Sequence, residues 1–359
     1  MITLEELIGS ITPADLQAEQ KAQEYIDSLA KPLRSLGKLE SISRKLAGMT
    51  GKTQNTFSKR CVLIFSSDNG VVEEGVASAP QSVTLAQTIN FTRNLTGVCV
   101  LAQQAGAGIK VYDMGVNAEL HHPGIIDRKI RKSTFNIAKG PAMSREEALR
   151  ALMAGASAAI DAAEEGYQMI GIGEMGIGNT TTSSAVLCGL TGLKPEETSG
   201  KGAGLTEESY QHKIEIIRQA LAVNQPDSGD VLDVIAKVGG FDIAAMAGAF
   251  LGAASRRMPA VMDGFICSVA ALCAARLCSA VVDYIIPSHC SKERGYAVAV
   301  KELGLSPMLL LDMGLGEGSG CPIAFSVVDF ACAMTNHMAT FAQAAIDDSY
   351  MDAVRDAEF

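Results

Sequence analysis

Residues 171–185, with the sequence GIGEMGIGNTTTSSA, contain the residue types of a phosphate-binding turn. The first six letters have the spacing G-x-G-x-x-G, at which the backbone of a dinucleotide-binding fold approaches a pyrophosphate. Residues 176–181 lead into a segment with a helical pattern. The free amides of a helix N-terminus, with small and hydroxyl-bearing neighbours, suit a single phosphate group. A capped helix start that binds no ligand would use the same residue types, so the stretch permits three interpretations.

The dinucleotide interpretation needs a second strand about 20 residues beyond the glycines, with an acid at its end for the ribose. Glu196 and Glu197 stand near that position, but no apolar run precedes them. Glu174 is also unfavourable, because a carboxylate inside the turn would face the pyrophosphate. A Rossmann-type oxidoreductase is therefore the weaker alternative, and a site for one phosphate group is favoured.

Six short apolar runs are candidates for the strands that position this turn. Each is followed by glycines or polar residues, and they cover residues 61–65, 109–112, 168–172, 259–262, 283–287 and 308–312. The segments between them are rich in alanine and have helical spacing; residues 144–166 open with Ser144 and Glu147, the pattern of a capping box. Continuous apolar strands that alternate with helices predict an α/β fold, doubly wound, with a mostly parallel sheet. Ligands of such sheets bind beyond the carboxyl ends of the strands, where the acids and glycines of this chain gather.

The two ends of the chain have helical pattern but no apolar run of this kind. We therefore expect residues 56–330 to form a large α/β catalytic domain. Residues 1–55 and 331–359 are expected to form a small helical domain built from both termini.

Composition excludes several classes of partner. The net charge is −10, aromatic residues make up 5% of the chain and Trp is absent, which argues against a nucleic-acid surface. The apolar tract 267–286 is interrupted by Arg276 and Asp283, so it predicts a buried helix that runs into a strand rather than a membrane span. Nine cysteines without a C-x-x-C pair indicate a reducing compartment, and the first residues do not have the pattern of a signal peptide. We expect a cytoplasmic protein.

Further motifs along the chain point to one family. They are DNGVVEEGV (68–76), PQSVT (80–84), GEMGIGNTT (173–181), GKGAGL (200–205), VGGFDIAAMAG (238–248), MDGFI (262–266), SHCSKERG (288–295) and LGEGSG (315–320). With these stretches the chain resembles the nicotinate-nucleotide:dimethylbenzimidazole phosphoribosyltransferases, which activate the lower ligand of cobamides. The resemblance extends from KPLRSLGKLE (31–40) to NHMATF (336–341), which is most of the chain.

The resemblance implies a reaction and an assembly. Phosphoribose moves from nicotinate mononucleotide to a nitrogen of an aromatic base, with inversion from β to α at C1′, and nicotinate is released. The α-riboside phosphate formed enters the nucleotide loop of cobalamin. No metal or redox cofactor takes part. The family forms dimers, so a homodimer, or a heterodimer with a paralogue, is expected.

The resemblance also implies roles for individual residues. Glu317 matches the catalytic base and Glu174 a second carboxylate of the active site. Positions that contact the nucleotide, above all its phosphate, correspond to Gly176, Gly178, Asn179, Thr180, Lys213, Gly264 and Ser291. The pocket for the base corresponds to Ala79, Gln87, Met175 and Leu315.

Two departures from the family pattern fall on the base side of the site. Residues 68–70 are D-N-G, so Asn69 stands at the His position of the more usual D-H-G. Ala79 stands directly before the proline, where the family commonly has Ser or Tyr. The acceptor therefore stays open among benzimidazoles, purines and phenolics. Relatives that activate phenolics work as pairs of paralogous subunits, so a partner subunit of such a pair is an alternative.

Overall fold

The computed structural model describes residues 2–201 and 204–351, so Gly202 and Ala203 of the motif at 200–205 lie outside the described residues. The chain forms two compact units. One comprises Met1–Thr12 and Lys59–Ala324, and the other comprises Pro13–Ser58 and Phe325–Phe359. Each is described by itself.

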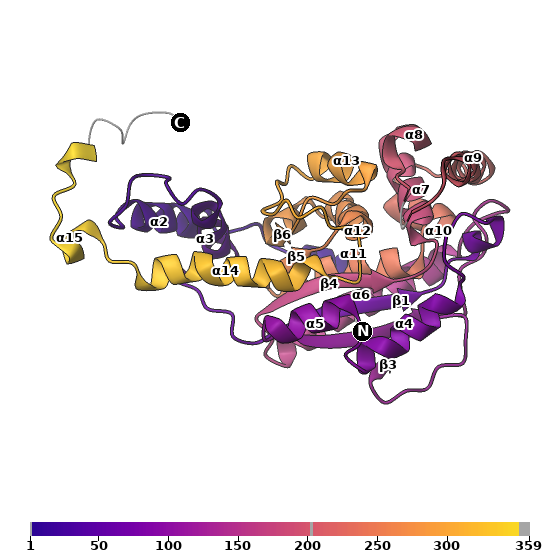
Figure 1. Cartoon of the computed structure of the whole chain (residues 1–359), viewed down its shortest axis with the longest axis horizontal. Coiled ribbons are helices and arrows are strands. Elements are labelled where there is room, and N and C mark those ends of the chain that lie inside the picture. Colours follow the sequence, from indigo (N-terminus) through magenta and orange to yellow (C-terminus); the bar gives the residue numbers. More distant parts are fainter. Residues whose placement is uncertain (1, 202–203, 352–359) are drawn as a thin grey trace. The chain divides into compact units, whose positions relative to one another are not determined.

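The larger unit is built on a parallel sheet of six strands in the order β3-β2-β1-β4-β5-β6 (Figure 1). The strands are β1 (Arg60–Ser67), β2 (Gly108–Gly115), β3 (Ile125–Asp127), β4 (Met169–Met175), β5 (Ala260–Met262) and β6 (Ile285–Pro287). Five of the six predicted runs form β1, β2, β4, β5 and β6, and the prediction for them is confirmed. The short edge strand β3 was not predicted. The strand order changes direction between β1 and β4, which creates a crevice at the carboxyl ends of these two strands.

The sixth predicted strand, residues 308–312, is wrong. Leu309 makes one isolated parallel bridge with His289, and the rest of the run forms no ladder. Leu310 is 85% exposed and Leu311 is 47% exposed. A strand is stabilised by a row of backbone hydrogen bonds and by a buried face, and this run has only the single bridge.

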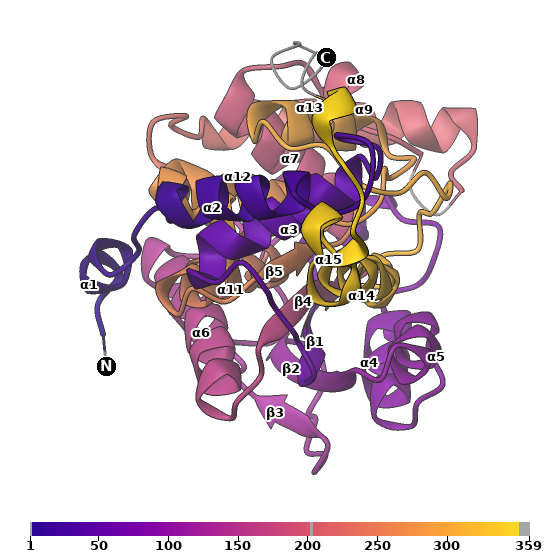
Figure 2. The same ribbon diagram turned by 90° about the vertical axis from the view of Figure 1, so that its left-hand side faces the viewer.

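Helices cover both faces of the sheet, so the predicted doubly wound α/β fold is confirmed. Helices α4 and α5 pack on one face and α6 and α11 on the other (Figure 2). The helical segments of this unit are α1 (Leu4–Gly9), η1 (Gly70–Glu74), α4 (Ser82–Thr92), α5 (Gly97–Gln104), α6 (Arg145–Glu164), α7 (Asn179–Thr191), α8 (Pro195–Thr198), α9 (Glu207–Asn224), α10 (Val231–Val238), α11 (Phe241–Ser255), α12 (Phe265–Leu277), η2 (Ser279–Tyr284), α13 (Arg294–Glu302) and the first turn of α14 (Gly320–His337). The predicted capping box is present, since Ser144 accepts the Glu147 amide and Glu147 accepts the Ser144 amide.

The apolar tract 267–286 forms α12, the short helix η2 and the start of β6, as predicted. No helix within the described part of the chain is both long and apolar enough to cross a membrane.

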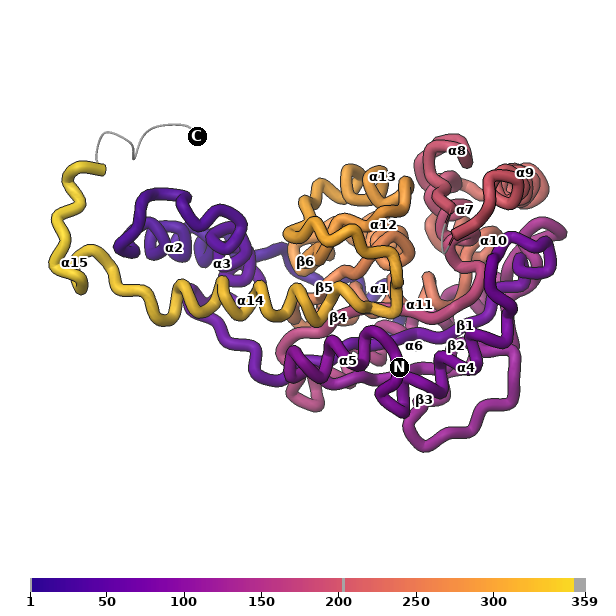
Figure 3. Tube along the Cα trace, in the orientation of Figure 1, coloured from indigo at the N-terminus to yellow at the C-terminus, as the bar shows by residue number. Residues whose placement is uncertain are grey.

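The smaller unit joins segments from the two ends of the chain. It contains α2 (Leu16–Asp27), α3 (Lys38–Thr50), most of α14, α15 (Phe341–Ala344) and η3 (Ser349–Met351). The Ser43 hydroxyl donates to the Ala331 carbonyl at 2.7 Å, so α3 and α14 lie side by side (Figure 3). Ile26, Leu29 and Met334 form its apolar cluster.

The limit of the large unit near the N-terminus differs from the sequence-based boundary. Residues 1–12 belong to the large unit, because α1 packs on α11 and the Thr12 carbonyl accepts from the Tyr284 hydroxyl at 2.9 Å. These are tertiary contacts that a helical pattern alone does not indicate.

Helices α6 and α11 approach each other backbone to backbone. A Cβ atom on Gly248 would lie 2.7 Å from the carbonyl carbon of Leu152, and one on Gly155 would lie 2.5 Å from the carbonyl carbon of Ala245. Such separations are shorter than van der Waals contact, so the two helices can pack this closely only where these side chains are absent.

We expect Gly248→Ala to lower the free energy of unfolding by about 1–3 kcal/mol, because the added methyl group forces the two helices apart. Gly140→Ala is the matched control, since a Cβ there would meet nothing within 4 Å. The control should change stability by less than about 0.5 kcal/mol. Urea denaturation of both variants is the measurement, and equal stabilities would contradict this account of the packing.

Candidate active site

A cavity of about 340 Å³ lies in the large unit at the carboxyl ends of the strands. Its walls come from the loop after β1 and the start of α4, from the turn between β4 and α7, from the segment between β5 and α12, and from the loops after β6 and before α14. It lies next to the point where the strand order reverses, which is where open α/β sheets bind ligands.

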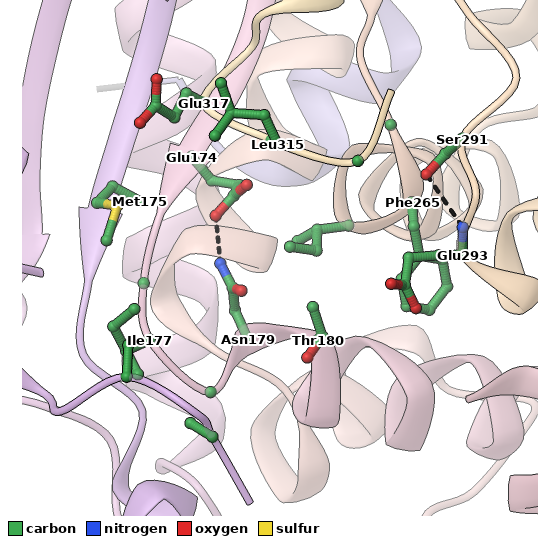
Figure 4. Close-up of a pocket in the computed structure, with 18 of the residues that line it drawn as sticks. Glu174, Met175, Ile177, Asn179, Thr180, Phe265, Ser291, Glu293, Leu315 and Glu317 are labelled. Atoms are coloured by element: carbon green, nitrogen blue, oxygen red, sulfur yellow. Dashed lines mark hydrogen bonds between the residues drawn. The ribbon is translucent and has the colours of Figure 1, made fainter. Parts of the chain in front are cut away.

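Twelve of the thirteen residues singled out from the sequence line this cavity. They are Ala79, Gln87, Glu174, Met175, Gly176, Gly178, Asn179, Thr180, Gly264, Ser291, Leu315 and Glu317. Figure 4 shows Glu174, Glu317 and Leu315 on one side and Thr180 and Ser291 on the other. The thirteenth, Lys213, does not line the cavity and lies fully buried in α9.

The loop that carries Glu317 rests directly on strand β4. A Cβ atom on Gly173 would lie 2.5 Å from the Cα of Gly318, so this approach requires glycine at 173. Gly316, Glu317 and Gly318 have φ values of +83°, +63° and +81°. The left-handed conformation is unfavourable for the non-glycine residue, and the surrounding contacts must stabilise it.

The Glu317 carboxylate accepts two hydrogen bonds and is only 5% exposed. Its Oε1 accepts from Gln87 Nε2 at 3.0 Å, and its Oε2 accepts from the Val98 amide at 3.3 Å in the first turn of α5. Both neighbours are N–H donors, so each oxygen of the carboxylate has a hydrogen-bond partner that holds it in place. Gln87 therefore contacts Glu317, in addition to lining the cavity.

Glu174 is the penultimate residue of β4, and its carboxylate faces the cavity. Asn179 Nδ2 donates to Glu174 Oε2 (Figure 4). The same amide group donates to Oδ2 of Asp242 at 3.1 Å. Burial, together with the negative charge of Asp242, raises the pKa of Glu174 to about 8. The two carboxylates of the cavity thus have different environments: Glu317 is held by two donors, and Glu174 by one.

Asp263 directly follows β5 and anchors the Glu317 loop. Its two carboxylate oxygens accept from the amides of Gly318 at 3.1 Å and Gly320 at 2.7 Å, where α14 begins. Burial raises the pKa of Asp263 to about 7, against the effect of these hydrogen bonds. The nearest basic group is His289, whose Nδ1 lies 3.8 Å from Asp263 Oδ1.

Small residues and a hydroxyl line the cavity at the start of α7. Gly178 has φ +91°, a conformation that favours glycine, directly before α7. Thr180 Oγ1 accepts from Lys213 Nζ at 3.0 Å, and the same ammonium group donates to the Gly200 carbonyl at 3.2 Å. Lys213 therefore lies behind Thr180, and burial lowers the pKa of its ammonium group to about 8.

Within residues 2–201 and 204–351, no three His, Cys, Asp or Glu side chains are grouped so that they could hold a metal ion.

Comparison with known proteins identifies the family. The family model DBI_PRT, described as a phosphoribosyltransferase, matches residues 11–346. The chain is 53% identical over 355 residues to the nicotinate-nucleotide--dimethylbenzimidazole phosphoribosyltransferase of Clostridium perfringens, covering 99% of this chain and 98% of the relative. The chain belongs to this phosphoribosyltransferase family.

Other relatives agree. The enzyme of the same name from Ruminiclostridium cellulolyticum is 50% identical over 96% of this chain and 98% of its own length. The crystal structure of CobT from Thermus thermophilus superposes with a TM-score of 0.89, at 39% identity, over 92% of this chain and 99% of that one. The family assigns the chain to the pentosyltransferases, and neither an oxidoreductase nor a partner subunit that activates phenolics is favoured.

The sequence did not single out two acids that the structure places in this phosphoribosyltransferase site. Asp263 follows an apolar run and precedes glycine, which is a signal that was available. Asp242 lies inside a helical motif, at the N-terminus of α11, and only its contact with Asn179 shows that it belongs here.

Proposed function

We propose that this phosphoribosyltransferase transfers phosphoribose from nicotinate mononucleotide to a nitrogen of an aromatic base, for the nucleotide loop of cobalamin. One observation carries the proposal: Glu317 and the first residues of α7 line the same cavity. A proton acceptor and a phosphate-type turn thus face the same space. The relatives that are named for this reaction support it.

The phosphate of the nucleotide is proposed to bind at the start of α7, with Gly264 and Ser291 opposite. A Cβ on Gly264 would lie 3.6 Å from Ser291 Oγ, so these two residues are adjacent. Gly176, Gly178, Asn179 and Thr180 supply the turn and the first residues of α7, where free amides and the helix dipole favour an anion. Lys213 adds a positive charge from behind Thr180.

Glu317 is proposed to be the general base. As one ring nitrogen of an azole attacks C1′, the proton on the other nitrogen must go to an acceptor, and the Glu317 carboxylate in the cavity wall supports this role. Glu174 lines the same cavity, and in this proposal it contacts the nucleotide.

The base is proposed to bind beside Ala79, Gln87, Met175 and Leu315, which line the same cavity as Glu317. Of these, Gln87 contacts the Glu317 carboxylate. A small residue at 79 leaves room there, and a methionine can repack around rings of different shape.

We further propose that the enzyme works as a dimer, either with a second copy or with a paralogue. All nine cysteines are free and seven are buried, which favours a reducing compartment such as the cytoplasm.

The proposal is tested by incubating the protein with nicotinate mononucleotide and dimethylbenzimidazole, adenine or phenol in separate reactions. Mass spectrometry should detect a riboside phosphate of at least one acceptor together with free nicotinate. Absence of product with every acceptor, at a protein concentration where binding of the nucleotide is measured, would refute the assignment.

We expect Glu317→Gln to lower kcat by at least about 100-fold, because the amide keeps the size of the side chain but cannot accept the proton. Binding of both substrates should persist, and calorimetric titration checks this. Near-normal turnover would remove Glu317 from the role of base and leave Glu174 as the next candidate.

We expect Lys213→Met to raise the KM for the nucleotide about 10-fold, because the positive charge that lies behind Thr180 and attracts the phosphate is lost. The pKa of about 8 for Lys213 adds a pH test. In the wild type the ammonium is charged below that pH and neutral above it, so nucleotide affinity should fall above pH 8, and the variant should lack this dependence. Lys201→Met is the control, because Lys201 lines the cavity but is half-exposed and paired with Glu207. An unchanged KM in Lys213→Met would contradict the assignment.

We expect Ala79→Phe to change the order of preference among benzimidazole, adenine and phenol, because the larger ring fills space at the base end. The KM for nicotinate mononucleotide should stay within about threefold of wild type, since a site remote from the phosphate leaves uniform nucleotide binding intact. If the order of acceptors is the same in both proteins, the base binds elsewhere.

A further inference from the structure

At the wall of the cavity, the carboxylate of Glu174 shares one amide group with a second buried carboxylate, Asp242, which does not line the cavity. Asn179 Nδ2 donates to Glu174 Oε2 and to Asp242 Oδ2, and Asp242 itself is 0% exposed. The proposed reaction uses Glu174 and has no role for Asp242. Two negative charges this close inside a protein repel strongly, so at neutral pH a proton must reside on one of the two groups.

The surroundings decide which carboxylate holds the proton. Asp242 accepts two N–H groups, from Asn179 and from the Ile243 amide at 3.0 Å, in the first turn of α11. A helix N-terminus stabilises an anion there. Glu174 accepts only the hydrogen bond from Asn179 among the residues that the structure describes. The anion therefore belongs to Asp242 and the proton to Glu174.

The other titratable groups around Glu174 also favour its protonated form. Asp263 from the end of β5 and Glu317 from the loop before α14 both face it as acids. Cys267 of α12 is also near, and burial raises the pKa of its thiol, so it stays neutral. None of these neighbours is a cation that would favour an ionised Glu174.

We propose that Asp242 is a positioning residue which, through Asn179, keeps Glu174 neutral with its O–H directed into the cavity. Asn179 occupies Oε2, which leaves Oε1 for the proton. Oε1 points toward the loop before α14, where a Cβ on Gly316 would lie 2.8 Å from it. The inference rests on the proposed function in one respect only, that substrate occupies this cavity.

The consequence is a division of labour between the two carboxylates. Glu317 accepts a proton, whereas Glu174 donates a hydrogen bond to an acceptor atom of the bound nucleotide. When the surroundings of two carboxylates give them different pKa values, one site can provide both an acid and a base. An ionised Glu174 would lose this donor, so kcat should fall as the pH rises through the pKa of Glu174, which burial and Asp242 raise to about 8.

The first test compares kcat as a function of pH in wild type and Asp242→Asn, with both substrates saturating. Saturation keeps the phosphate bound beside Lys213, so the titration of that residue does not enter kcat. Asparagine removes the charge and keeps an oxygen for Asn179. The alkaline fall in kcat should move to lower pH by about one unit or more, since the repelling charge is gone. An alkaline fall at the wild-type position would overturn the proposal.

Asp68→Asn is the matched control. Asp68 is also a buried acid at the carboxyl end of a strand, and burial raises its pKa as well. The charged groups near it are Asp113 and Lys129 rather than Glu174. Its substitution should leave the position of the alkaline fall unchanged, whatever it does to stability.

A second test does not depend on the folding of Asp242→Asn. Glu174→Gln keeps an N–H donor toward the cavity, whereas Glu174→Leu has none, so the glutamine variant should retain at least about tenfold more kcat. Its kcat should also lack the alkaline fall. Infrared spectra of the substrate-free protein at pH 7 should contain a protonated-carboxyl band that Glu174→Gln removes. If the band is absent, the inference about Glu174 is overturned, even where phosphoribosyl transfer is demonstrated. If the band is present but no transfer occurs, only the proposed function is refuted.

Discussion

The approach of two backbones at Gly173 and Gly318 is the constraint on which the site depends. Strand β4 and the loop before α14 touch where neither has a side chain. This contact sets Glu317 beside the strand that carries Glu174 near its carboxyl end, although the two residues are far apart in the chain. Asp263 fixes the loop in place by accepting the Gly318 and Gly320 amides. Any side chain at 173 would separate the two carboxylates.

The cavity concentrates acids in a protein interior, which is costly unless each is paired or hydrogen-bonded. Here backbone amides and one asparagine provide most of the pairing, and the buried cation Lys213 lies at the other end. We infer that in this arrangement the proton resides on Glu174 and the negative charge on Asp242. The same sheet positions both Glu174 and the loop of Glu317. Helices α6 and α11 cover one face of this sheet, and their backbones are so close that Gly155 and Gly248 have no room for a side chain.

Local patterns in the sequence were sufficient for most of the elements. The runs at 61–65 and 168–172 became β1 and β4, because a continuous apolar strand buried on both faces is visible in the residues themselves. The cap at Ser144 and the helix that starts after Gly178 follow from short-range hydrogen bonds and backbone conformation. The sequence motifs also determined the family, and they identified most residues that line the cavity.

Only the tertiary structure decided how distant residues meet. The apolar run 308–312 lies outside the sheet, because it forms only one β-bridge and its leucines at 310 and 311 are exposed. The tertiary structure placed Lys213 behind Thr180 rather than on the cavity wall, and it brought Asp242 to Asn179. The physical reason is that periodicity and capping act over a few residues, whereas the charge and burial of a side chain depend on segments that only folding brings together.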